Sequence, residues 1–401
     1  MRRQEVIFVT IPVFMGYACL FALQDQLMKQ IQKQVPALEN ANSPERHLFG
    51  FLVSFQYIFN LIFRFAHNIV FSRLRPRHRA FLAMGFMMLA LGTIIIIFFV
   101  CKSDRMGFVA MSYAFGGMAI GTYESNVLSA ITPLGHQTKL WATLGIPIGV
   151  VSITVGAFAL ISAGVPAVAL YVAVIVALVG GMLVFRFRIP DTPMKDNSDS
   201  LEKFWENLRE WRQWWAHCKW HCLALMGDMF CVSAFSPGVM LYIYNAPCGL
   251  HLYKGGPHMD NASFFALYNF FTFLGETISR KLAYVGPPRK PVFFLVFSAA
   301  GVIVNLLKIP LLSCAAGFLV FFANGSIYNH TCRKVDSYVL PKHNLIALSI
   351  WLLIGDVGSV TGSNLISYIR SWTGGAADGI AVACVNGVCE AGYKLTGVCH
   401  H

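Results

Sequence analysis

The sequence has few charged residues, and acids are the scarcer kind. Charged side chains make up 12% of the 401 residues, against roughly 25% in soluble domains. Asp and Glu number 19 and Lys and Arg 31, which gives a formal net charge of +12. No polar stretch is long enough to form a separate soluble domain. These absences argue against a soluble globular protein.

Apolar residues are abundant instead, and they occur in runs of membrane-spanning length. A helix needs about 20 apolar residues to cross a bilayer. We predict about eleven such spans in an all-α polytopic membrane protein, the first retained rather than cleaved as a signal peptide. The predicted spans cover residues 6–24, 48–72, 80–101, 106–132, 140–163, 166–185, 222–246, 262–282, 291–307, 310–332 and 344–370.

The positive charges follow membrane topology. With the N-terminus in the cytoplasm, the inner segments hold more than twice as many Lys and Arg residues as the outer segments. This distribution obeys the positive-inside rule. It predicts a cytoplasmic N-terminus and an outer C-terminus, in the plasma membrane or an organelle membrane, and it excludes nucleic acid as a partner.

Four domains are predicted along the chain. Residues 1–185 form a six-helix bundle and residues 222–370 a five-helix bundle, joined by a cytoplasmic loop over 186–221 and followed by an outer tail over 371–401. In the loop, apolar residues recur at helical spacing from Phe204 to Trp215. We expect one Trp-rich amphipathic helix on the inner membrane surface, leading into the seventh span.

Four stretches resemble the equilibrative nucleoside transporter family. They are Phe-Phe-Ala-Asn-Gly at 321–325, Phe-Phe-Ala-Leu-Tyr-Asn-Phe-Phe-Thr-Phe-Leu-Gly at 264–275, Ser-Pro-Gly-Val at 236–239 and the basic loop at 73–79. The resemblance implies a major-facilitator-like fold with 6+5 helices and alternating-access transport of a nucleoside, a nucleobase or a related small polar solute.

The predicted eighth helix departs from the family pattern. Asn269 and Gly275 match it, but Thr272 and Glu276 stand where the family has an Asp and an Arg that its members need for transport. This departure keeps an alternative open, a battenin-like organelle membrane protein with a trafficking or lysosomal role. Glu276 precedes Arg280 by four residues, so a helical ion pair is a second interpretation of this acid.

Polar residues inside spans are the candidate substrate site, because they are costly in lipid and usually face a cavity or one another. Proton coupling is a further hypothesis, should Glu124, Glu276 or Asp356 titrate near neutrality. Arg64 and Asp228 are expected to reach the inner interface instead, with a role in the transport pathway as the second interpretation. The predicted substrate-binding residues are Glu276, Thr272, Asn269, Glu124, Asn126, Asp356, Gln24 and Asn324.

Enzymatic signatures are missing. The sequence has no metalloprotease His-Glu-x-x-His and no nucleophile elbow, so a membrane enzyme is the least favoured class. His217, Cys218, His221 and Cys222 have helical spacing that zinc can use, but interface packing explains them better. No cofactor and no oligomeric state are predicted; the expected partners are a small-molecule substrate and membrane lipid.

The predicted outer segments carry two further features. Cys248, Cys384, Cys389 and Cys399 lie where disulfides are permitted, and their pairing stays open. Asn261 begins a glycosylation sequon close to the eighth span.

Overall fold

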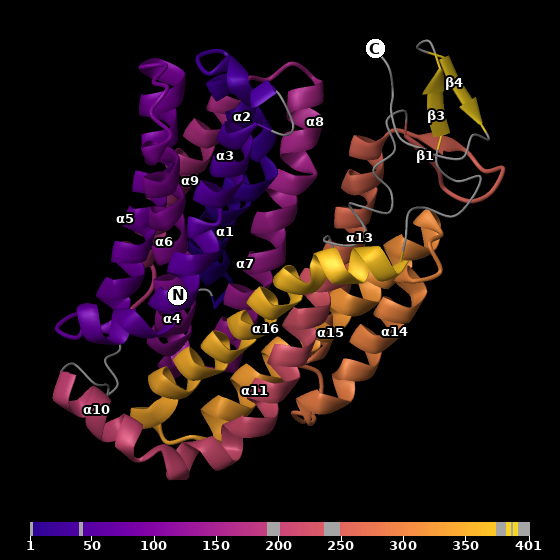
Figure 1. Ribbon diagram of the computed structural model, residues 1–401. Coiled ribbons are helices and arrows are strands. Elements are labelled where there is room, and N and C mark those ends of the chain that lie inside the picture. Colours follow the sequence, from indigo (N-terminus) through magenta and orange to yellow (C-terminus); the bar gives the residue numbers. More distant parts are fainter. Residues whose placement is uncertain are drawn as a thin grey trace. The chain divides into compact units, whose positions relative to one another are not determined.

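A computed structural model describes residues 3–39, 43–190, 201–235, 249–373, 382–385 and 388–391. These residues are almost entirely helical (Figure 1). Two small antiparallel hairpins are the exception: β1 (Leu250–His251) pairs with β2 (His258–Met259), and β3 (Val382–Val385) pairs with β4 (Val388–Ala391). The predicted Ser-Pro-Gly-Val motif, Cys248 and Cys399 fall outside the described residues.

A helix lies at each predicted span. The α-helices before residue 191 are α1 (Ile7–Ala22), α2 (Gln24–Gln32), α3 (Pro44–Val53), α4 (Phe55–Val70), α5 (Pro76–Thr93), α6 (Gly107–Ile131), α7 (His136–Thr154), α8 (Gly156–Ser162) and α9 (Ala167–Phe187). A π-helix over Ile94–Val100 extends α5. Those after residue 200 are α10 (Leu201–Arg209), α11 (Trp211–Ser233), α13 (Asn261–Leu282), α14 (Leu295–Asn305), α15 (Pro310–Tyr338) and α16 (Asn344–Thr373).

Seven helical segments of the described chain are long and apolar enough to cross a membrane. The chain is therefore a multi-pass integral membrane protein, and its all-helical fold class is confirmed. The seven segments are Gln4–Ala22, Pro44–Val70, Pro76–Val100, His136–Ser162, Ala167–Phe187, Pro310–Tyr338 and Pro341–Ile366.

The chain divides into two compact units. Unit 1 comprises Met1–Lys219 and Cys332–Leu353, and unit 2 comprises Trp220–Thr331 and Ile354–His401. The end of α15 and the start of α16 thus belong to unit 1, while the rest of both helices belongs to unit 2.

In unit 1, α6 is the central helix. It packs against α4 and α5, while α1 packs against α7 and α9 (Figure 1). Most side chains of α6 are buried, including Glu124, Ser125 and Asn126. Gly117 and Gly121 let α4 approach closely, because a Cβ on Gly121 would lie only 2.6 Å from the backbone oxygen of Asn60.

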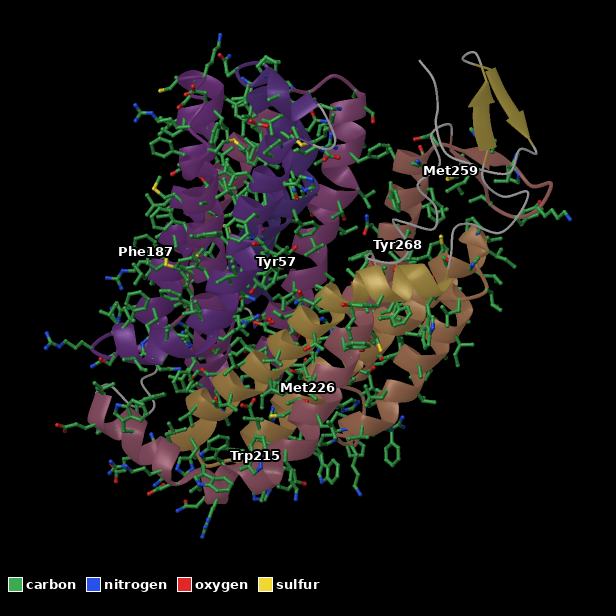
Figure 2. The ribbon with its side chains drawn as sticks, in the orientation of Figure 1. Tyr57, Phe187, Trp215, Met226, Met259 and Tyr268 are labelled. Carbon is green, nitrogen blue, oxygen red and sulfur yellow. The ribbon has the colours of Figure 1, made fainter. Side chains whose placement is uncertain are left out.

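The helix α4 shows the inside-out polarity of a membrane helix. Its buried side chains are all polar, and its exposed face carries apolar residues such as Tyr57, Ile62 and Val70. Phe187 at the end of α9 is 77% exposed and lies at the edge of the same unit (Figure 2). Lipid is the surrounding that accommodates such a surface, since in water it would form an apolar patch. The buried polar residues of α4 are Gln56, Asn60, Arg64, His67 and Asn68.

The segment Cys332–Leu353 is fixed to the rest of unit 1 by ion pairs. Lys139, fully buried at the start of α7, places its Nζ 2.6 Å from Oδ1 of Asp336. The amide of Asn344 donates to the same oxygen at 3.0 Å. Glu210 accepts from Lys342 at 2.7 Å and bonds to His343 at 2.8 Å.

The Trp-rich amphipathic helix differs from the prediction, because it is broken into α10 and α11 at Glu210. Phe204 and Trp214 are buried, whereas Trp205, Trp211 and Trp220 are exposed. The bonds from Lys342 and His343 hold Glu210 at the junction between the two helices. The break is thus stabilised by tertiary contacts that helical periodicity does not reveal.

In unit 2, α11 packs against α16, and α15 contacts both α13 and α14. Gly358 of α16 lies against the backbone oxygen of Met226, and Gly275 of α13 lies against that of Phe318. A small apolar cluster at one end of the unit joins β1, α13 and α15, and Figure 2 labels its member Tyr268. The buried members of this cluster are Leu250, Phe264, Tyr268 and Cys314.

Candidate functional site

An ion pair between α4 and α6 is the charged centre of unit 1. The Nη1 atom of Arg64 lies 2.5 Å from Oε2 of Glu124, and both side chains are buried. Arg64 also donates to the backbone oxygen of Ile120 at 3.4 Å. The expectation that Arg64 reaches the interface is wrong, because its charge is neutralised inside the unit.

A neutral polar network surrounds the fully buried ring of His67. Its Nε2 lies 3.0 Å from the hydroxyl of Ser125, and its Nδ1 lies 3.1 Å from the amide of Asn126. Asn68 is adjacent and accepts a hydrogen bond from Arg79 at 3.0 Å. The predicted residues Glu124 and Asn126 therefore each contact a polar residue of α4, Arg64 and His67 respectively.

Gln56, on the same buried polar face of α4, has unused hydrogen-bonding capacity. It lies on α4 two turns before Arg64, and its side chain is fully buried. Neither its amide nitrogen nor its amide oxygen has a hydrogen-bond partner within the described chain. A polar ligand or water here would satisfy both atoms.

Asp228 is the centre of a second cluster, in unit 2. It is fully buried on α11. Its Oδ1 accepts from the hydroxyl of Ser298 on α14 at 2.7 Å, and its Oδ2 accepts from the amide of Asn324 on α15 at 2.8 Å. The expectation that Asp228 reaches the interface is also wrong. Asn324, a predicted substrate-binding residue, belongs to this cluster.

Glu276 forms a buried ion pair with Arg280 one turn later on α13. The guanidinium of Arg280 also stacks 4.5 Å from the ring centre of Tyr328, and its backbone oxygen accepts from Asn329 at 2.9 Å. Gly325 lets α15 approach, since a Cβ there would lie 2.7 Å from the backbone oxygen of Glu276. Glu276 is therefore held in the α13–α15 contact by its own helix.

The other predicted substrate-binding residues are Thr272, Asn269, Gln24 and Asp356. The hydroxyl of Thr272 donates to the backbone oxygen of Asn269 at 2.8 Å, so it is used within α13. Asn269 is half-buried, and so is Gln24 at the start of α2. Asp356 is buried on α16.

The four candidate zinc ligands do not converge in the structure. His221 bonds to the hydroxyl of Thr331 at 3.0 Å, and His217 stacks on the ring of Tyr338. Cys218 and Cys222 are both buried. Within the described ranges, no group of three or more His, Cys, Asp or Glu residues has a geometry that would hold a metal ion.

Two features predicted for the outer side fall partly within the described residues. Asn261 is the first residue of α13, which is capped by Asp260 accepting from the amide of Ser263 at 3.0 Å. Hydrogen bonding by the Ser263 side chain, and then by its backbone amide, lowers the pKa of the Asp260 carboxyl. Cys384 and Cys389 are register partners in the β3–β4 hairpin. Disulfide pairing and glycosylation stay predictions.

Ser298 and His67 are two members of these clusters that sequence reasoning missed. Ser298 gave no signal, because a lone serine in an apolar run is common. His67 was also missed. Its position three residues after Arg64, on the polar face of the same helix, is nevertheless a pattern that the sequence contains. Arg280 was noted only as the partner of Glu276.

Comparison with known structures identifies the fold. The chain is similar to the crystal structure of a major facilitator superfamily transporter, FucP, in the outward conformation. The TM-score is 0.64, and the match covers 93% of this chain and 94% of that chain at 15% sequence identity. No protein-family model and no curated protein sequence matches the chain. The chain thus has the major facilitator fold, with buried polar clusters on its helices.

Proposed function

We propose that this chain carries a small polar solute of the nucleoside or nucleobase class across its membrane by alternating access. The observation that carries the proposal is the pair of buried polar clusters, one in each unit of a major facilitator fold. Buried ionisable groups in spans are costly and are usually retained for a pathway or for one another. The fold favours a carrier over a membrane enzyme.

The motif positions support the substrate class. Asn324 and Gly325, from the stretch that most resembles nucleoside transporters, lie where α15 contacts α11 and α13. Amide, hydroxyl and carboxylate groups suit sugar hydroxyls and base edges, which both donate and accept hydrogen bonds. We propose as substrate-binding residues Glu276, Thr272, Asn269, Glu124, Asn126, Asp356, Gln24 and Asn324, and Gln56 in addition.

An uptake panel tests this proposal. The purified chain in proteoliposomes is given labelled purine and pyrimidine nucleosides and nucleobases, and empty liposomes are the control. We expect saturable uptake of at least one compound. Absence of flux for every purine and pyrimidine would contradict the nucleoside proposal.

Glu276→Gln then tests the site. This variant leaves Arg280 unpaired, so Glu276→Gln/Arg280→Gln is the matched control that removes both charges. A reduced apparent affinity in both variants supports substrate contact. Unchanged kinetics in the single variant would remove Glu276 from the site.

One observation favours a second function. The eighth-helix positions that the nucleoside family fills with Asp and Arg hold Thr272 and Glu276, and here both have partners within α13. This occupancy suits a battenin-like organelle protein with a trafficking or lysosomal role. Residence in a lysosomal membrane together with no flux in the panel would favour it.

A further inference from the structure

Asp228 differs from three other buried acids in the charge of its partners. Glu124 pairs with Arg64, Glu276 with Arg280 and Asp336 with Lys139. Asp228 is fully buried, yet its two hydrogen bonds come from the neutral groups of Ser298 and Asn324. No ion pair joins Asp228 to a basic residue in the part of the chain that the structure describes.

The groups on the surrounding helices do not supply a counter-charge. On α11 itself the neighbouring titratable group is Cys231, and α13 contributes Glu276, whose negative charge disfavours a second one at Asp228. Arg280, also on α13, is engaged with Glu276. From α14 and α15 the facing groups are the neutral Ser298 and Asn324, and α16, which packs on α11 through Gly355 and Gly358, carries the acid Asp356.

The two partners suit a carboxyl group in either protonation state. A serine hydroxyl donates to a carboxylate, and after protonation it can turn and accept the new hydrogen. The amide of Asn324 donates in both states, to the oxygen that carries no proton. A lysine or arginine partner would instead hold the acid permanently ionised.

The same geometry disfavours a metal cation. Hard cations take several oxygen ligands. Asn324 presents its nitrogen to Asp228, and Ser298 presents its hydroxyl hydrogen, so both neighbours offer donors to the carboxylate rather than lone pairs to an ion. The single carboxylate is left as the only negative ligand that this trio would supply.

We propose that Asp228 is the proton-binding site of this chain, with Ser298 and Asn324 as the residues that position its carboxyl group. Asp228 takes one proton from water at one membrane face and returns it to water at the other, with no other bond changed. Coupling of this proton to solute movement rests on the proposed transport function. Proton binding does not.

Infrared spectroscopy of the purified full-length chain tests proton binding directly. A protonated carboxyl group absorbs apart from a carboxylate, so its band can be followed as the pH is raised. We expect a band at neutral pH that Asp228→Asn abolishes. The matched control Asp336→Asn replaces an acid paired with a lysine and should leave the band unchanged. A band unaffected by Asp228→Asn, or an Asp228 ionised over the whole titration, would overturn the proposal.

Ser298→Ala keeps the acid, and it provides a second test if the Asp228→Asn variant does not fold. Removing a donor to the carboxylate favours its protonated form, so the pH at which the band disappears should rise, by about one unit. An unmoved transition would overturn the positioning role and the proposal with it. Proton binding without uptake in the substrate panel would refute transport alone, and uptake without the carboxyl band would refute this inference alone.

Discussion

Buried charges in the described chain occur chiefly as pairs between or along helices, and the Arg64–Glu124 pair joins α4 to α6 inside unit 1. Burying two charges costs several kcal/mol per ion, and close contact repays much of it. Removing one partner therefore leaves the other charge buried, with its desolvation cost no longer compensated. The pair's value lies in charge neutrality rather than in net attraction.

We expect Arg64→Met to destabilise the protein strongly, by about 3–5 kcal/mol, because Glu124 would remain buried without a cation. The double variant Arg64→Met/Glu124→Gln should recover much of this loss, since it removes both charges. Unfolding of the detergent-solubilised protein measures the effect. A double variant no more stable than Arg64→Met would contradict the pairing.

Residue-level prediction from sequence reached the types of the buried residues but only one of their partners. The charges within spans singled out Glu124 and Glu276 as facing a cavity or another ionisable group, and in the structure each is buried against an arginine. Sequence reasoning offered Arg280 as the partner of Glu276, which the structure confirms. It did not identify the partner of Glu124, because Arg64 and Glu124 are far apart in sequence and meet only when α4 packs on α6. Asp228 was misplaced for the same reason, since Ser298 and Asn324 come from two other helices.

At the scale of elements, close packing of α6 on α4 depends on glycine. A Cβ on Gly117 would lie 2.9 Å from the backbone nitrogen of Asn60 and closer still to the backbone oxygen of Gln56. Backbone atoms cannot rotate away as a side chain can. The two helices would have to separate to accept even a methyl group.

Gly117→Ala should therefore lower stability by about 1–3 kcal/mol, the usual cost of overpacking. The matched control is Gly85→Ala in α5, where nothing lies within 4 Å of the added Cβ. The control should be neutral or slightly stabilising, because alanine favours helix more than glycine does. Thermal unfolding of both variants in the same detergent measures the difference. Equal midpoints would argue against this helix contact.

The junction between α10 and α11 should respond to acid. Hydrogen bonds from Lys342 and His343 lower the pKa of the Glu210 carboxyl below its ordinary value. An acid with a lowered folded-state pKa stabilises the fold above its unfolded-state value, about 4.3, and loses that contribution as pH falls through the folded-state value.

Wild type should thus exceed Glu210→Gln in melting temperature at neutral pH by a small margin, because the site is solvent-accessible. The margin should disappear on acidification below the ordinary glutamate range. Melting curves of both proteins over a pH series measure it. A margin that is constant with pH would contradict the assigned bonds.

Helix positions were predicted well where runs of apolar residues determine them. The predicted spans 106–132 and 166–185 correspond to α6 at Gly107–Ile131 and α9 at Ala167–Phe187. The end of a helix was predicted wrongly where tertiary contacts determine it. The helix α15 runs on to Tyr338, past its predicted end, because the polar turn around Asp336 is held by Lys139 and Asn344.

The whole molecule is a membrane protein whose predicted orientation rests on charge alone. Orientation has a direct probe in Cys101, which is exposed. Cys231 is half-buried, and the buried cysteines are Cys19, Cys218, Cys222, Cys314 and Cys332. Cys101 follows the π-helix on the predicted outer side. Arg73, exposed between α4 and α5, marks the predicted inner side.

A membrane-impermeant maleimide should label Cys101 from the outer side, and Cys101→Ser should remove that share of the labelling. In the Cys101→Ser background, Arg73→Cys should be labelled only from the inner side.

For a plasma-membrane protein, labelling of intact and of permeabilised cells compares the two sides. For an organelle protein, cells opened only at the plasma membrane should give the opposite order, because the lumen is then the outer side. Because one crossing, α5 with its π-helix, separates the two positions, their labelling must be opposite in either membrane. Labelling of both from one side would refute the span over Pro76–Val100, and reversed labelling at the plasma membrane would refute the orientation.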